Sequence, residues 1–127
     1  MSDAVSSRLL DQRVRNRVID VLELLGDGNA GVQDVGVAEY FNMFFDWADE
    51  PQRALSTYTA TEVALLEKVL AVLLDALAAT NGLNTVDEIC DSGWPRRTAV
   101  VAQEAFSAMV ARGRFREDVE EAEPGRD

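Results

Sequence analysis

Apolar residues recur every three or four positions through most of this 127-residue chain, and this period constrains its fold more than any other feature. Two long segments show it most clearly, with apolar seams at Leu10, Val14, Val18, Val21 and Leu25 and at Val63, Leu66, Leu70, Leu73 and Leu77. Such spacing places apolar side chains on one face of an α-helix, whereas a half-buried strand requires strict alternation. The chain is therefore predicted to be all-α, a helical bundle around a single core.

Turn and capping signals give the ends of the predicted helices. The first helix starts at Ser6 or Ser7 and ends at Gly26, where the turn-forming residues 26–31 begin a loop. Thr59-Ala-Thr-Glu62 and Thr85-Val-Asp-Glu88 are capping boxes that open two later helices. Pro95 suits the first position of the last helix, and Gly113 caps its end. The predicted helices are accordingly 7–25, 34–49, 59–80, 85–91 and 95–112.

The helix predicted over 34–49 is the most aromatic part of the sequence and is apolar on two faces. Such a helix must be buried on two sides. It is the central helix of the domain, or it lends its second face to a partner subunit, or it lines a ligand pocket. In the second case, Tyr40, Met43 and Trp47 are the candidate interface of a homodimer.

The residue inventory excludes several kinds of chemistry. There is no histidine, so histidine-based triads and metal sites are impossible, and the single cysteine excludes an internal disulfide or a multi-cysteine zinc site. The loop 26–31 has the glycine spacing of a P-loop without its Lys-Ser/Thr, and it fails two defining positions of an EF-hand. We therefore expect no catalytic residue, no metal and no cofactor, and the chain is not predicted to be an enzyme.

Charge is distributed unevenly along the chain, whose net charge is −11. Residues 26–92 carry −10 and residues 117–127 carry −5, whereas residues 93–116 carry +4. Residues 117–127 have almost nothing to bury and are predicted to form an acidic, disordered tail. Two roles for this tail stay open: a solvated terminus, or a segment that competes electrostatically for the neighbouring arginines.

The C-terminal motifs follow the order of a helix-turn-helix and the first strand of a wing. Residues 83–115 resemble the winged helix-turn-helix domains of bacterial transcriptional regulators, with matching residues at Thr85, Glu88, Ile89, Gly93, Thr98 and Gly113. The resemblance reaches back to residue 59 if the helix there is the first of the unit. It implies one helical domain over 1–116, in which 1–50 supply N-terminal helices and 59–116 form the winged-helix-like unit. Residues 114–116 are a candidate wing strand, after which the acidic tail replaces the returning strand.

Such a unit implies a small, non-enzymatic regulator that binds double-stranded DNA. The candidate contacts are Arg96, Arg97 and Thr98 at the start of the last helix, Gln103 further along it, and Arg112, Arg114 and Arg116 near the wing. A basic patch this small neutralises few phosphates, so tight binding favours two copies and a homodimer is expected. The alternative is an adaptor or inhibitor whose acidic middle and aromatic helix bind a basic protein partner, the arginines being internal counter-charges.

The sequence has no apolar run near the ~18 residues that a membrane span requires. Its first residues also lack the basic and apolar regions of a signal peptide. A cytoplasmic protein that does not interact with membranes is therefore expected.

Overall fold

The computed structural model describes residues 5–49, 53 and 55–125. Their regular structure is helical, with only one isolated β-bridge, between Arg114 and Gly125. The all-α prediction is therefore confirmed for the described residues. The helices are α1 (Ser7–Leu25), α2 (Asn29–Val35), α3 (Val37–Ala48), α5 (Ala60–Ala79), α6 (Val86–Asp91) and α7 (Trp94–Arg112).

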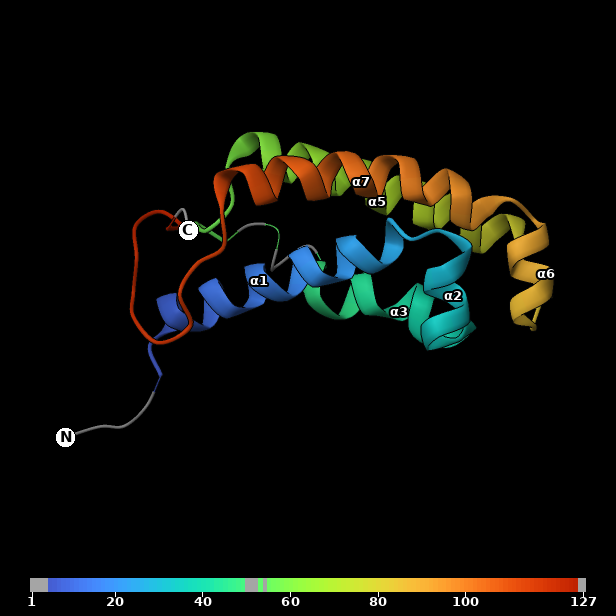
Figure 1. The fold of residues 1–127 in the computed structure, drawn as a ribbon, viewed down its shortest axis with the longest axis horizontal. Coiled ribbons are helices and arrows are strands. Elements are labelled where there is room, and N and C mark those ends of the chain that lie inside the picture. The colour runs from blue at the N-terminus through green and yellow to red at the C-terminus, as the bar shows by residue number, and fades with distance from the viewer. Residues whose placement is uncertain (1–4, 50–52, 54, 126–127) are drawn as a thin grey trace.

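The four longest helices contact one another in a closed cycle. α7 packs against both α5 and α1, and α3 contacts α1 and α5 on the opposite side. Figure 1 shows α5 and α7 lying side by side along their lengths, with α6 at one end of the molecule and the C-terminal segment at the other. None of the described helices has the length and apolar content needed to cross a lipid bilayer.

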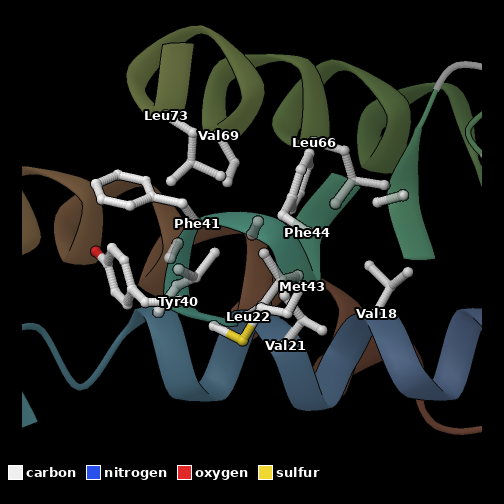
Figure 2. Close-up of a cluster of buried hydrophobic side chains, with 14 of the residues drawn as sticks. Val18, Val21, Leu22, Tyr40, Phe41, Met43, Phe44, Leu66, Val69 and Leu73 are labelled. Carbon is white, nitrogen blue, oxygen red and sulfur yellow. The ribbon is translucent and has the colours of Figure 1, made fainter. Parts of the chain in front are cut away.

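The aromatic helix α3 is the central helix of the core. Phe41 and Phe44 reach toward Leu66, Val69 and Leu73 of α5, while Met43 lies against Val21 and Leu22 of α1 (Figure 2). Tyr40 and Phe44 have no exposed surface at all. α3 thus buries both of its apolar faces within one chain except at Trp47, which agrees with the first of the three interpretations that the sequence left open.

The capping boxes form as the sequence predicts. The Thr59 and Thr85 hydroxyls each accept a hydrogen bond from the backbone N–H three residues later, and the Glu62 and Glu88 carboxylates each accept one from the capping residue's N–H. The second box has its carboxylate in solvent, where hydrogen bonds donated by the Thr85 hydroxyl and by the backbone N–H groups of Asn84 and Thr85 lower the pKa of Glu88. These contacts place the starts of α5 and α6 within one residue of the prediction.

The prediction was wrong between residues 26 and 37. Residues 29–35 form the short helix α2, although turn-forming residues predicted a loop over the first part of it, and α3 begins at Val37 rather than near residue 34. Gly36 separates the two helices with a φ of +87°, a conformation that only glycine adopts at low cost. The apolar period continues across this glycine, so periodicity alone did not reveal the break.

The acidic C-terminal segment also differs from its prediction. Residues 114–125, called the strap from here on, leave the end of α7, run along the first half of α1 and then loop back toward the end of α7 (Figure 1). The expectation of a disordered tail therefore does not hold for residues 117–125, because α1 supplies hydrogen-bond partners for their backbone. Residues 126–127 lie outside the described part of the chain.

Glu62 is the centre of a buried ionic cluster that joins three helices. Its carboxylate accepts hydrogen bonds from Arg15 of α1 at 2.7 Å and from Arg112 of α7 at 2.8 Å. The Arg15 side chain is 0% exposed and that of Glu62 is 3% exposed, so water solvates neither charge. Arg15 also donates to the carbonyl oxygens of Met109 and Gly113, where the negative end of the α7 dipole offsets the surplus positive charge.

Replacing Glu62 tests how much of the fold depends on this cluster. Glu62→Gln keeps an acceptor for the capping box but leaves Arg15 without its counter-charge, so we expect a loss of about 3–5 kcal/mol in the free energy of unfolding, measured with urea. The matched control is Glu88→Gln, which makes the same change in an exposed capping box and should have little effect. Similar losses in the two variants would contradict a special role for the buried cluster.

Candidate interaction surfaces

The two arginines at the start of α7 are exposed. Arg96 and Arg97 lie in the first turn of this helix, which begins at Trp94, and the Arg97 guanidinium stacks 4.7 Å from the centre of the Trp94 ring. Figure 1 shows α6 crossing the end of α7 at a wide angle. Of the residues predicted to contact DNA, these two have the free surface that such a contact needs.

Thr98 is buried, and Gln103 is hydrogen-bonded within the chain. Thr98 is fully buried, so its side chain has no surface to offer a duplex. Gln103 is exposed, but its side-chain amide donates a 2.7 Å hydrogen bond to the carbonyl oxygen of Gly26. The loop between α1 and α2 also comes close to the start of α7, since a Cβ on Gly28 would lie 3.8 Å from that of Ala99. The N-terminal helices therefore crowd one side of the predicted recognition helix.

The three arginines predicted to hold phosphates are paired with carboxylates of this chain. Arg112 bridges Glu62 and Glu123 with N–O distances of 2.8 Å to each, Arg114 pairs with Asp20 at 2.9 Å, and Arg116 pairs with Asp118 at 3.0 Å. The hydrogen bonds from Arg116 lower the pKa of the Asp118 carboxyl. Within the described residues, the structure therefore gives these arginines the role of internal counter-charges.

The predicted dimer residues separate into two groups. Tyr40 and Met43 are 0% and 6% exposed and belong to the core, so neither presents a face to a partner. Trp47 is 41% exposed near the end of α3. The helical period grouped the three correctly on adjoining positions but could not show that other helices of the same chain cover two of them.

Trp47 lies on an acidic surface. The exposed residues of α3 include Glu39 and Asp46, and Asp49 follows the helix directly. None of these three carboxylates forms an ion pair with a residue that the structure describes. Arg53, the basic residue closest in sequence, instead donates a 2.8 Å hydrogen bond to the carbonyl oxygen of Ala48 at the end of the helix. The surface formed by Glu39, Asp46, Trp47 and Asp49 is called the acidic face of α3 below.

The polar face of α1 is a second candidate surface, and its side chains hydrogen-bond the strap. Four of its side chains, Arg8, Gln12, Arg13 and Asn16, hydrogen-bond the backbone of the strap. Gln12 alone makes three such bonds, donating to the carbonyl oxygens of Arg116 and Val119 and accepting from the N–H of Glu121. Gln12 and Asn16 are 0% and 3% exposed, and neither was predicted from the sequence to have a role.

The only cysteine, Cys90, is buried, as the apolar run around it suggests. Burial raises the pKa of its thiol, and the nearby Asp87 and Asp91 raise it further. A thiol held in its neutral form is a poor nucleophile. Among the described residues, no three histidine, cysteine, aspartate or glutamate side chains gather closely enough to hold a metal ion.

Comparisons of this chain with protein-family models, curated proteins and solved structures gave no match. Its function is therefore inferred from the surfaces described above.

The burial of Tyr40 leads to a pH-dependent prediction. Burial raises the pKa of Tyr40 from 10.0 to about 12, partly offset by the nearby Thr98 hydroxyl. The folded state thus holds the phenolic proton more tightly than the unfolded state. The stabilisation is complete below pH 10 and is lost as pH rises toward 12.

Tyr40→Phe should remove the part of the stability loss at alkaline pH that comes from Tyr40, as measured by urea unfolding between about pH 8 and about pH 12. At neutral pH its stability should stay within about 1 kcal/mol of wild type, because the Tyr40 hydroxyl, although near that of Thr98, makes no hydrogen bond of standard geometry with the described residues. Burial also raises the pKa of Tyr58, so Tyr58→Phe is the companion variant that retains the Tyr40 contribution. An unchanged alkaline profile in Tyr40→Phe would show that Tyr40 is not buried as described.

Proposed function

We propose that this chain is a non-enzymatic protein-interaction module that binds a basic partner through the acidic face of α3. The observation that carries the proposal is the contrast between two sets of charges. The arginines near the end of α7 are paired within the chain, whereas Glu39, Asp46 and Asp49 are exposed on or directly after the helix that carries the exposed Trp47, without ion-pair partners among the described residues.

Trp47 is the expected anchor of this interface. An exposed ion pair contributes only about 0–1 kcal/mol, so the three carboxylates alone would give weak binding. A tryptophan that becomes buried at the centre of an interface contributes about 2 kcal/mol or more. A lysine or arginine of the partner can make both kinds of contact, because its cation can stack on the Trp47 indole while it pairs with Asp46 or Asp49.

The net charge of the chain supports a basic partner. At −11, the protein attracts cationic surfaces over long range and repels polyanions. Such steering raises the association rate and weakens as salt is added. Binding to the acidic face is therefore expected to fall steeply with ionic strength.

DNA binding is the second candidate, and the exposed Arg96 and Arg97 favour it. The winged-helix-like unit remains a prediction, and these two residues lie where its recognition helix would begin. Two arginines neutralise about two phosphates, which gives a salt slope of about −2, against slopes several times larger for proteins with roughly 6–10 phosphate contacts. We therefore rank this candidate below a basic protein partner.

Binding of a fluorescein-labelled oligo-arginine peptide, followed by fluorescence anisotropy at low salt, tests the proposal. Trp47→Ala should weaken binding by about tenfold or more, equivalent to at least about 1.4 kcal/mol, and Asp46→Asn with Asp49→Asn should also weaken it. The matched control is Glu67→Gln with Asp75→Asn, which removes the same charge from exposed positions of α5.

Two results would count against the proposal. If the α5 control loses as much affinity as the α3 variants, the peptide responds only to net charge. If labelled random duplex DNA binds the wild type at low salt, and Arg96→Ala with Arg97→Ala abolishes this, the DNA-binding candidate takes precedence.

A further inference from the structure

The polar face of α1 holds the strap in a regular register. Asn16 contacts Phe115, Gln12 contacts residues 116–121, and Arg8 contacts Glu121 and Ala122. The three α1 side chains are four residues apart, so they line one face of the helix. The strap runs antiparallel to α1 as far as Ala122, so that each successive helical turn binds the next part of it, and it then turns back to the end of α7, where Gly125 pairs with Arg114.

Most of these contacts are to the strap's backbone. Asn16 bonds both the N–H and the carbonyl oxygen of Phe115, as a neighbouring β-strand would. Arg13 donates twice to the carbonyl oxygen of Glu117, and Arg8 donates twice to that of Glu121. Recognition of this kind depends on the path of the backbone, and many sequences can follow the same path.

Side-chain contacts then select for acidic and apolar residues at particular places, except at the start of the strap, where the basic Arg114 pairs with Asp20 of α1. Glu117 accepts a hydrogen bond from Asn16 at 3.0 Å, and Glu123 pairs with Arg112. The buried Phe115 and Pro124 anchor the two ends of the strap. The Phe115 ring lies 5.2 Å from the Arg8 guanidinium and 5.4 Å from that of Arg15. An acidic segment with an apolar residue at each end therefore matches this surface.

We propose that the polar face of α1 is a binding site for an acidic peptide segment of a partner protein, and that the strap occupies this site in cis. The charge complementarity and the set of backbone contacts that the strap makes define the ligand: an acidic segment without regular secondary structure that follows α1 and then loops back, with an apolar residue at each end. The site is independent of the proposed function, because α1 and the acidic face of α3 are separate surfaces.

Gly113 is the point at which the strap can be released. Its φ is +113°, and a Cβ there would lie 2.6 Å from the carbonyl oxygen of Gly125. Gly113→Ala therefore strains the exit from α7 and blocks the closed position of the strap's far end. Gly82→Ala is the matched control, because Gly82 has a φ of +92° and a Cβ there would meet nothing within 4 Å.

The test uses the full chain and a fluorescein-labelled peptide with the sequence of residues 114–125. In the wild type the tethered strap competes at an effective concentration near the millimolar range, so the peptide should bind weakly. Gly113→Ala should bind it at least about tenfold more tightly than the wild type or Gly82→Ala. Adding Gln12→Ala should reverse this gain, and a peptide with Gln in place of Glu117, Glu121 and Glu123 should bind less tightly.

Hydrogen exchange in the same variants reports the strap directly. The N–H groups of Phe115 and Glu121 are bonded to Asn16 and Gln12, and they should lose protection in Gly113→Ala but not in Gly82→Ala. A released strap without tighter peptide binding would overturn the proposal. Retained protection with unchanged binding, or equal binding of the Gln-substituted peptide, would overturn it as well.

If Gly113→Ala does not fold, the wild type supplies the test. Millimolar unlabelled peptide should shift the NMR signals of the Gln12 and Asn16 side-chain amides and expose the strap's N–H groups to exchange. The absence of both changes would overturn the proposal.

Discussion

The fold depends on the buried carboxylate of Glu62. A buried charge is tolerated only when it is paired and hydrogen-bonded, and Glu62 meets this condition through Arg15 and Arg112. Because these partners come from α1 and α7, the three helices can approach only in the arrangement that brings all three groups together. The same requirement draws in the end of α7, whose carbonyl groups complete the coordination of Arg15. The strap starts directly after these carbonyls, so the cluster also fixes where the strap begins.

The structure shows which groups neutralise the C-terminal arginines. In sequence, Arg112, Arg114 and Arg116 form a basic group next to an acidic tail, and either solvent, DNA or the tail can neutralise them. In the structure, Arg112 is held by Glu62 and Glu123, and Asp20 and Asp118 pair with the other two. The basic segment thus largely holds the chain together, and the negative charge of residues 26–92 is left as the dominant feature of the surface.

Much of the fold could be predicted from the sequence because it depends on local signals. Capping boxes act within four residues, and the apolar period of a helix repeats within every turn, so the ends of α1, α5, α6 and α7 were placed closely. Gly36 was missed because a single glycine interrupts the helix without interrupting the apolar period. The burial of Tyr40 and Met43 was left open for a different reason: the period shows which residues share a face, but only the packing of the other helices decides what covers that face.

The candidate sites were harder to predict because they depend on contacts between distant residues. Gln12 and Asn16 lie about a hundred positions before the strap residues that they bind, and two polar residues on a helix have no signature that distinguishes them from solvated ones. A signal was nevertheless present in the charges. The first helix carries four arginines against three acidic residues, and the acidic residues 117–127 have the opposite net charge. Complementary charge identifies the two segments that attract each other, but the backbone hydrogen bonds that hold the strap in register can be seen only in the folded chain.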